Sequence, residues 1–464
     1  MNTTTNLKPR ADPATGGPGS PELYARYVND TWVRMLDLLG VEREYVRCEG
    51  TRLTTASGRE VLDFLSGYCV YNTGHNHPRL LEALRQELNR RGPTMLQSHV
   101  PPLAGELAQR LSSLAGGRLT RTVFTSTGSE GVETAIKFSR AFTKRSGILH
   151  AEGSFHGLTC GALSLMGNPW WRKDFEPLLP DVESVPYLDL SVLEAKLSTG
   201  KFAAFIVEPI QSENGVRIPP TADWGRAAEI CRRTGTLLVF DEVQSGIGRT
   251  GKGLAAHHFG VDPDMVILAK ALSGGLIPVG ALLMREEVNR SVYSNIERAF
   301  LHASTFGENT LAMRAALTVL DILEEERLCE RATRLGEMLR SGVRDLSRKY
   351  EMVSEVRGMG LMNGIEFRAP ESMRLRLLHA GFTKMHPGLF GQMLVATLLQ
   401  EEGILTQMCG HNYRVVKASP PLTTSEGEIE RFLASLGRTL ERIHSGLGFW
   451  TRGLAIAARA LRPS

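Results

Sequence analysis

Two charged residues, Asp241 and Lys270, each end a short apolar stretch of the chain. Residues 237–241 read Leu-Leu-Val-Phe-Asp, and residues 265–270 read Met-Val-Ile-Leu-Ala-Lys. Apolar stretches of this length, bounded by turn residues, are typical of strands that are buried on both faces of a parallel sheet. Ligands of such sheets bind beyond the carboxyl ends of the strands. We therefore expect a carboxylate and an amine side by side at one edge of a sheet.

A carboxylate and an amine at such an edge are the two groups that a pyridoxal phosphate enzyme needs. The Lys270 amine would form a Schiff base with the cofactor. Asp241 would pair with the pyridinium nitrogen, which keeps the ring an electron sink. The alternative is that each charged residue merely caps its strand, and these two stretches alone leave both interpretations open.

A loop of small residues at 126–131, Ser-Thr-Gly-Ser-Glu-Gly, follows a predicted strand at 122–125 and opens a predicted helix that runs through Phe142. The first turn of a helix presents free backbone N–H groups and the positive end of the helix dipole, so a phosphate fits there. Gly128 and Ser129 are the candidate phosphate ligands. Ser and Thr are also ordinary N-cap residues, so this signal is weak by itself.

Two further stretches carry candidate site residues. Phe155 and His156 lie between glycines after a predicted strand at 148–150, where the aromatic ring could stack on a planar ligand. The apolar residues 203–207 end in Glu208, which repeats the pattern of a strand followed by a carboxylate. A Phe-His pair alone would more often be part of an ordinary loop.

Two other motifs do not support the function that they first suggest. Residues 246–252, Gly-Ile-Gly-Arg-Thr-Gly-Lys, have the spacing of a phosphate-binding P-loop, but Gly253 stands where that motif needs a hydroxyl for magnesium. We therefore exclude a nucleoside triphosphatase. His75 and His77 lie close together, but no third ligand with suitable spacing accompanies them, so we expect no metal site.

The composition is that of a soluble globular protein with two or three domains. The chain has 464 residues, 42% hydrophobic and 22% charged, and a net charge of +4 that is too small to indicate a nucleic-acid partner. The six cysteines are scattered, as is typical of reduced thiols in a cytoplasmic protein. We find no signal peptide and no apolar stretch long enough to span a bilayer.

The predicted fold is α/β, with a mostly parallel central sheet flanked by helices and a smaller α+β domain. The expected divisions are a disordered lead-in at 1–21, an N-terminal segment at 22–64, a large cofactor-binding domain at 65–310, a bridging helix with the small domain at 311–445, and a basic amphipathic tail at 446–464.

The tail has apolar residues at helical spacing and three arginines. The expected apolar face consists of Trp450, Leu454, Ala457 and Leu461. A basic amphipathic helix of this kind can lie on a membrane surface. It can equally pack on the small domain or on a second subunit.

Taken together, these stretches resemble the class III, fold-type I, pyridoxal-phosphate-dependent aminotransferases from about residue 24 to residue 444. One such motif would be weak, but the whole set in this order is specific. The motifs are Ser126–Glu130, Phe155–Gly157, Glu208–Gln211, Asp241–Gln244, Ala269–Ala271 and Ser304–Gly307.

The resemblance implies a role for each motif residue. Lys270 would hold the internal aldimine and move the proton between substrate and cofactor, and Asp241 would pair with the ring nitrogen. Phe155 and Val243 would sandwich the ring, and Gln244 would lie near its phenolic oxygen. 

Further residues complete the implied site. Gly128 and Ser129 would bind the phosphate, and His156 and Glu208 belong to the same cofactor-binding set. Thr305 would reach the phosphate of a partner subunit, so the resemblance implies a homodimer with its active site at the subunit interface.

Within the family, the chain is most similar to hopanoid-biosynthesis and putrescine aminotransferases. Two departures matter. Lys417 stands where many members have an Arg that holds the substrate carboxylate with a planar two-point fork, and Lys offers only a point charge. Glu308 replaces a Gly of the loop that carries Thr305. Lys417 stays the candidate substrate-binding residue.

We therefore expect a ping-pong aminotransferase that takes nitrogen from an amino-acid donor, glutamate, and gives it to a terminal aldehyde or ketone, for example a hopanoid-like or other specialised-metabolite aldehyde. The alternative is an ω-aminotransferase of the diamine or ornithine type that acts on putrescine, ornithine or acetylornithine. An aminomutase or decarboxylase on the same fold is a lesser alternative, because a fold does not determine the reaction.

Overall fold

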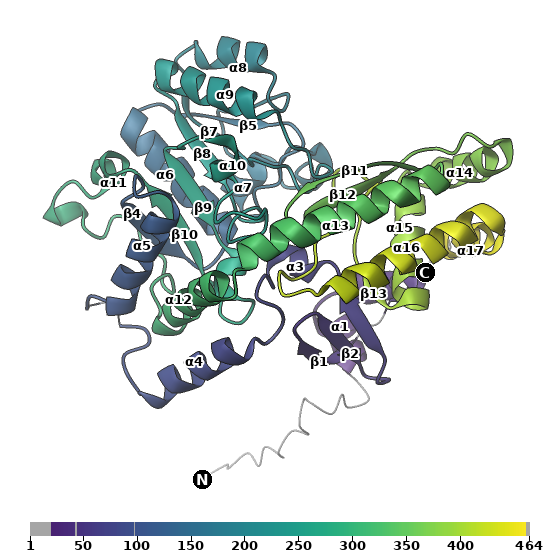
Figure 1. The fold of residues 1–464 in the computed structure, drawn as a ribbon. Coiled ribbons are helices and arrows are strands. Elements are labelled where there is room, and N and C mark those ends of the chain that lie inside the picture. The colour runs from purple at the N-terminus through teal and green to yellow at the C-terminus, as the bar shows by residue number, and fades with distance from the viewer. Residues whose placement is uncertain (1–19, 42–43, 97, 461–464) are drawn as a thin grey trace, which may run out of the picture.

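The computed structural model describes residues 20–41, 44–96 and 98–460 (Figure 1). Most of the predicted lead-in, 1–21, lies outside the described residues, and helix α1 begins at Ser20. Residues 78–325 gather around one large sheet. Residues 328–460, green to yellow in Figure 1, form a second lobe beside it, together with the purple N-terminal elements.

The large domain is built on a seven-stranded sheet in the order β4-β10-β9-β8-β7-β5-β6. Strand β10 is antiparallel to both of its neighbours, and the other strands run parallel to one another. The predicted mostly parallel sheet is therefore confirmed. Its strands are β4 (Arg121–Thr125), β5 (Gly147–Ala151), β6 (Val182–Val185), β7 (Phe202–Val207), β8 (Leu237–Asp241), β9 (Met265–Leu268) and β10 (Gly280–Met284).

Helices cover both faces of this sheet, which is why its central strands are apolar without alternation. Along β8, Val239 packs into the core that lies under α6, while Leu238 and Phe240 pack into the core on the opposite face. The helices of this domain are α4 (Pro78–Asn89), α5 (Pro102–Leu114), α6 (Gly128–Thr143), α7 (Cys160–Ser164), α8 (Leu190–Leu197), α9 (Thr221–Thr234), α10 (Ala256–Phe259) and α11 (Glu286–Val292), with 3-10 turns at Pro169–Trp171, Lys270–Ser273 and Ile296–Arg298.

The bridging helix α12 (Thr310–Glu325) leads into the small domain, whose sheet has the antiparallel order β11-β12-β14. The small domain combines helices with antiparallel strands, as expected of an α+β domain. The elements are α13 (Leu328–Lys349), β11 (Val353–Met359), β12 (Met362–Phe367), α14 (Met373–Met385), α15 (Leu389–Glu402), β14 (Val415–Ala418), α16 (Glu426–Ser445) and α17 (Gly448–Ala460).

The N-terminal segment joins the small domain through a shared sheet. Strand β3 pairs in parallel with β13 (Ile404–Leu405), more than three hundred residues later in the chain. Two helices rather than one begin this segment, because Asn29 separates them and accepts a hydrogen bond from the Trp32 N–H as the N-cap of α2. The segment contains α1 (Ser20–Tyr27), α2 (Asp30–Leu39), β1 (Tyr45–Glu49), β2 (Arg52–Thr55), β3 (Glu60–Asp63) and α3 (Ser66–Cys69).

The tail forms α17 and packs on the small domain, which is one of the alternatives that the sequence left open. Trp450 is fully buried, and its Nε1–H donates to the Ile443 carbonyl oxygen at 3.0 Å. Phe449 and Ile456 are buried beside it, whereas Leu454 is exposed. The buried face is therefore rotated relative to the predicted one. Of the other residues of the predicted face, Leu461 and the side chain of Ala457 lie outside the described part of the chain. None of the described helices combines the length and the apolar character needed to cross a membrane.

The histidine pair and the P-loop-like stretch both have structural roles. His75 Nε2 lies 2.7 Å from Asp63 Oδ2, and the His75 ring stacks on Tyr71. Arg249, from the P-loop-like stretch, is fully buried and donates hydrogen bonds to carbonyl oxygens of Leu361 and Pro420 in the small domain. This arginine therefore ties the two domains together.

Candidate active site

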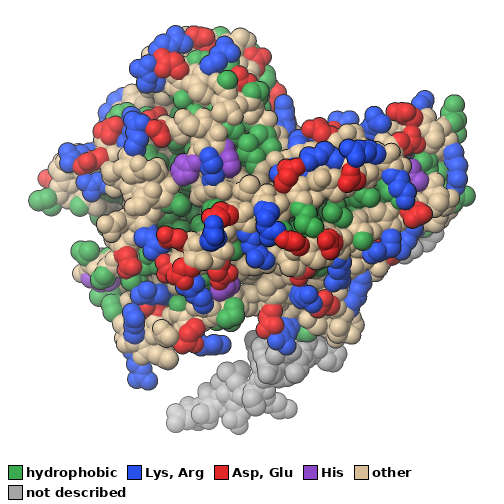
Figure 2. All heavy atoms as spheres, in the orientation of Figure 1, with side chains coloured by type: hydrophobic (Ala, Val, Ile, Leu, Met, Phe, Trp, Pro, Cys, Tyr) green, Lys and Arg blue, Asp and Glu red, His purple; other side chains and the backbone are tan. Residues whose placement is uncertain are grey.

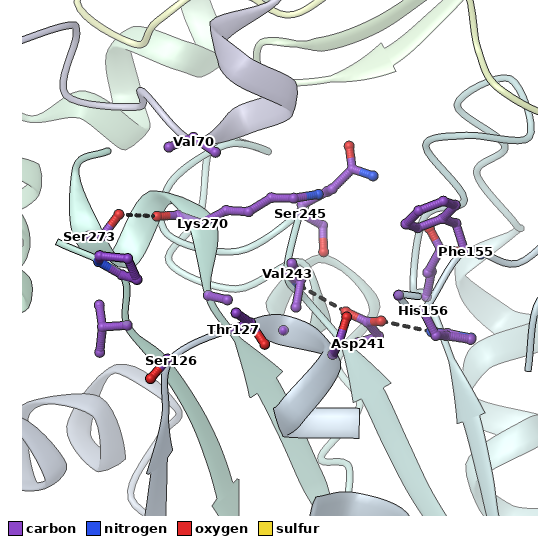
Figure 3. A pocket seen from close by; sticks show the side chains of 18 of the residues that line it. Val70, Ser126, Thr127, Phe155, His156, Asp241, Val243, Ser245, Lys270 and Ser273 are labelled. Atoms are coloured by element: carbon purple, nitrogen blue, oxygen red, sulfur yellow. Dashed lines mark hydrogen bonds and ion pairs between the residues drawn. The ribbon is translucent and has the colours of Figure 1, made fainter. Parts of the chain in front are cut away.

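A cavity of about 400 Å³ lies beyond the carboxyl ends of β8 and β9 (Figure 3). Its lining comes from the end of β8, the turn after β9, the start of α6 and the loops that follow β5 and β7. All of the predicted cofactor-binding residues except Thr305 line it. These are Gly128, Ser129, Phe155, His156, Glu208, Asp241, Val243, Gln244 and Lys270.

Asp241 is held in a fixed orientation at the end of β8. Its Oδ2 lies 2.7 Å from His156 Nδ1, and its Oδ1 accepts the backbone N–H of Val243 at 3.1 Å. The Asp241 carboxylate is almost fully buried, as is the His156 ring. Two partners on two different loops therefore orient a carboxylate that still lines the cavity.

Lys270 follows β9 and begins a 3-10 turn with a φ of 44°, a left-handed conformation that is uncommon for a residue with a side chain. Strained backbone of this kind is often found at functional sites. Figure 3 shows the Lys270 side chain extending across the cavity, with Val243 and Asp241 on one side of it. Burial lowers the pKa of the Lys270 amine, although the charges of Cys69, Glu213 and Asp241 act in the opposite direction. A lowered pKa increases the share of neutral, nucleophilic amine near neutral pH.

The start of α6 forms a cradle for an anion. Thr127 caps the helix by accepting the Glu130 N–H. Gly128 and Ser129, whose first-turn N–H groups have no partner inside the helix, line the cavity. A Cβ atom at Gly128 would lie 2.9 Å from Val243, and one at Gly157 would lie 2.1 Å from the Ser129 hydroxyl. The two glycines therefore keep the cradle open.

Two loops supply the walls of the cavity. The Phe155 N–H donates to Glu208 Oε1 at 3.0 Å, which connects the loop after β5 to the end of β7. Burial raises the pKa of Glu208 well above its ordinary value, and the nearby Asp241 charge raises it further. Burial therefore favours the neutral form of Glu208, while Asp241 stands at the end of β8, where a carboxylate can face a ring nitrogen.

The donor set of the cavity fits pyridoxal phosphate. The fit rests on an amine, a buried carboxylate, an anion cradle and an aromatic wall in one space. His156 Nε2 and Gln244 Oε1 are also buried without a hydrogen-bond partner among the described residues, as expected of polar atoms that serve a bound group or a water molecule.

Lys417, the predicted substrate-binding residue, lies beside this cavity rather than in its lining. Its ammonium is 2.6 Å from Glu213 Oε1 and sits 4.5 Å above the centre of the Tyr68 ring. Gln244 Nε2 also donates to Glu213 Oε1, at 3.3 Å, so the pair adjoins the cofactor residues. Lys417 and Glu213 are both buried, and Lys417 is only 2% exposed.

Electrostatics keeps this pair ionised. Burial alone would raise the pKa of Glu213, but the Lys417 charge holds it down to about 2. Burial alone would lower the pKa of Lys417, and Glu213 raises it instead. Sequence reasoning identified neither Glu213 nor Tyr68. Glu213 lies only two residues beyond the recognised motif Glu208–Gln211, and this proximity is the only sequence feature that could have indicated a role for it in the site.

Thr305 is placed away from the cavity. It is exposed and lines a separate surface cavity together with His302 and Glu308. Thr305 does not line the cofactor cavity of its own chain. Its contact with the phosphate of a partner subunit stays a prediction. Glu308 is exposed in the same loop.

The comparisons with known proteins agree with this geometry. The chain matches the family described as "Aminotransferase class-III" over residues 40–440. It is 37% identical to "Putrescine aminotransferase" of Pectobacterium atrosepticum, covering 84% of this chain and 81% of the relative. It is 35% identical to "Aminotransferase PigE" of a Serratia species over 91% of this chain, but it spans only about half, 53%, of that relative's length.

Solved structures show the same relationship. The ornithine aminotransferase of Toxoplasma gondii superposes with a TM-score of 0.77 at 30% identity, covering 86% of this chain and 90% of that one. An ω-transaminase of Thermomicrobium roseum superposes with a TM-score of 0.81 at 30% identity, covering 92% and 99%. An amine transaminase from an uncultivated Pseudomonas species, in its PLP-bound form, gives 0.75 at 28% identity, covering 86% and 94%. The chain belongs to the class III aminotransferases, which have the type I fold and use pyridoxal phosphate.

Proposed function

We propose that this protein is an aminotransferase that moves an amino group from glutamate to a terminal aldehyde or ketone by a ping-pong mechanism. The observation that carries this proposal is that Lys270, Asp241 and the anion cradle of α6 surround one cavity. Pyridoxal phosphate supplies, when bound, the electron sink that stabilises negative charge at the substrate carbon.

The chain's own residues provide positioning and proton transfer. The Lys270 amine anchors the cofactor and then accepts and returns the proton at the substrate carbon. Asp241, oriented by His156 and the Val243 N–H, keeps the ring nitrogen protonated. The N–H groups at the start of α6 and the hydroxyl of Ser129 would hold the phosphate and keep the cofactor in a fixed position.

The donor carboxylate is proposed to bind at Lys417. Glu213 occupies the Lys417 ammonium in the described conformation, so a donor carboxylate binds there by displacing the Glu213 carboxylate. An acceptor without a carboxylate leaves the Glu213–Lys417 pair intact. Lys417→Ala should therefore raise the KM for glutamate more than the KM for the aldehyde. Equal effects on both substrates would remove Lys417 from the donor site.

The acceptor is proposed to be an uncharged aldehyde, with a hopanoid-like or other specialised-metabolite aldehyde as the example. Among the residues that line the cavity, Lys270 and His156 are the only basic ones. Neither is available for a substrate carboxylate, because Lys270 is the proposed catalytic amine and His156 is hydrogen-bonded to Asp241.

A diamine or ornithine-type ω-aminotransferase is the second candidate. The named relatives include a putrescine aminotransferase and an ornithine aminotransferase. The Glu213 carboxylate at the edge of the cofactor site also offers a counter-charge for the second ammonium group of a diamine. In that case putrescine, rather than an aldehyde acceptor, would be the characteristic substrate.

The protein is proposed to work as a cytoplasmic homodimer. The loop that carries Thr305 is rich in exposed apolar side chains, with Ile296 93%, Phe300 72% and Phe306 59% exposed. Apolar surface of this extent is typical of a protein–protein interface. All six cysteines are free, which agrees with a reducing compartment. Sedimentation should give a dimer, and Ile296→Asp with Phe300→Asp should give a monomer that has lost activity.

Absorbance of the purified protein tests the proposed reaction. The protein should be yellow, should lose that band when glutamate is added, and should regain it when an aldehyde acceptor follows. Putrescine in place of glutamate tests the second candidate. A yellow band that no amino donor removes would overturn both. Lys270→Ala is the matched control, because it should bind the cofactor and show no turnover.

A further inference from the structure

Helix α14 has apolar side chains on two opposite faces. Leu375, Leu378 and Phe382 point inward and pack into the core of the small domain. Met373 and Leu377, four residues apart, lie on the opposite side and are 70% and 68% exposed. A surface helix usually has one apolar stripe, so the outer stripe has no explanation in the packing of this chain. The double pattern also explains why the sequence does not indicate an amphipathic helix here.

The outer stripe is bordered by basic residues. Arg374, Arg376 and Lys384 are exposed, and α14 contains no Asp or Glu. None of these three residues forms an ion pair within the described part of the chain. The nearest acidic residue in sequence, Glu371, is paired with Arg368 at 3.3 Å. The outer face of α14 is therefore apolar at its centre and carries a net positive charge at its borders.

This face lies at one end of the molecule. Figure 1 shows α14 beside α17 at the end of the small domain that is most distant from the large sheet. A Cβ atom at Gly453 of α17 would lie 2.2 Å from the Phe382 ring of α14, so the two helices are in close contact. Figure 2 shows hydrophobic and basic side chains next to one another at this end. Leu454 of α17 adds a further exposed apolar side chain.

We propose that the outer face of α14 binds the surface of a membrane that contains anionic lipid. In this arrangement Met373 and Leu377 enter the boundary between headgroups and acyl chains. Arg374, Arg376 and Lys384 contact the lipid phosphates. Interleaved apolar and basic side chains on one helix are characteristic of helices that lie in a membrane interface.

The dimensions of the face distinguish a lipid surface from other occupants. Two large apolar side chains on a protruding helix make too small a contact for a stable interface with a second copy, which needs about 800 Å² on each partner. The same protruding end can rest on a flat surface without a complementary groove. The positive charge is complementary to an anionic surface.

The proposed site lies on α14 rather than on the tail that the sequence indicates. Deleting the tail would not test it, because Trp450 is part of the small-domain core and its loss would disturb folding. Point substitutions on the exposed side of α14 leave the core and the cofactor cavity untouched. Activity on small substrates in solution should therefore stay unchanged in these variants.

Flotation of the full-length holoenzyme with vesicles tests the proposal. Vesicles of phosphatidylcholine with phosphatidylglycerol should bind the protein, and vesicles of phosphatidylcholine alone should not. Arg374→Glu with Arg376→Glu should lower the partition coefficient by about fivefold or more for each residue. Leu377→Glu should lower it several-fold. Added salt should weaken binding, because it screens the basic side chains.

Matched controls distinguish a site from general attraction. Arg85→Glu with Arg226→Glu makes the same change in net charge on exposed positions of α4 and α9, and Leu88→Glu removes an exposed leucine elsewhere. These variants should keep binding. The proposal is overturned if wild-type protein does not float with anionic vesicles, or if the controls lose as much binding as the α14 variants. If sedimentation shows that Leu377→Glu dissociates an oligomer, this face is an interface between protein chains, and the lipid proposal is overturned.

Discussion

Removing one member of the buried Glu213–Lys417 pair should cost far more stability than removing both. Lys417→Met leaves the Glu213 carboxylate buried without its cation, and Glu213→Gln leaves the Lys417 ammonium without its anion. A buried charge that loses its partner typically destabilises a protein by about 3–5 kcal/mol. The double variant removes both charges together, and it should lie close to the wild type.

The magnitude follows from the pKa of Glu213. Its value of about 2, against an ordinary 4.5, corresponds to about 3 kcal/mol of stabilisation. The folded pKa is lowered, so this stabilisation is present above pH 4.5 and is lost as the pH falls towards 2. The pKa of Lys417 is raised, so its contribution is present below its ordinary 10.5 and is lost as the pH rises beyond its folded value. The pair therefore stabilises the protein across the neutral range.

The assay is thermal unfolding of the wild type, the two single variants and the double variant, at equal concentration and cofactor saturation. For 464 residues the unfolding entropy is about 1 kcal/mol per kelvin, so each kcal/mol shifts the Tm by about 1 °C. Each single variant should melt about 3–5 °C below the wild type at pH 7. The double variant should recover most of that loss, which corresponds to a coupling energy of about 5 kcal/mol or more.

Additive losses in the double variant would refute this reasoning, because they would show that the two charges contribute independently. Lys417→Arg is the matched control, since it keeps the positive charge opposite Glu213. It should melt closer to the wild type than Lys417→Met does. A pH series gives an independent check, because the wild type should lose stability relative to the double variant as the pH falls from 4.5 towards 2.

The remaining predictions concern the cofactor site and the core. Gly128→Ala places a Cβ atom 2.9 Å from Val243 and should weaken pyridoxal phosphate binding about tenfold, as measured by fluorescence titration of the apoenzyme. Trp450→Ala should destabilise the protein by about 3–5 kcal/mol in denaturant titration, because it empties a fully buried site. Burial raises the pKa of Glu242 to about 7, so its contribution to stability should fall as the pH rises from 4.5 to 7; Glu242→Gln should abolish that dependence in melting curves at pH 5 and 8.

The central sheet and the cofactor residues could be predicted from the sequence because their signals are local. Strands β8 and β9 are short apolar stretches that end in Asp241 and Lys270, and α6 begins at a loop of small residues. The direction of parallel strands then places both ends at one edge of the sheet. One strand pattern and one helix-start pattern therefore located most of the cavity.

Other features depend on residues that lie far apart in the chain. Glu213 and Lys417 are 204 residues apart, and no local pattern shows that they meet. Strand β3 pairs with β13 across more than three hundred residues, and Tyr68 reaches Lys417 from a turn with left-handed backbone. Only the packing of the two domains decides such contacts.

In the sequence, the residues at the strand ends follow from patterns within single elements, whereas the type of fold and the cofactor follow from the resemblance of the whole ordered set of motifs to a known family. The tertiary structure decided that the Lys417 ammonium is occupied by Glu213, that the tail packs through Trp450, and that α14 exposes an apolar face. The physical reason is that burial and charge pairing depend on which elements pack together, and these elements lie far apart in the chain.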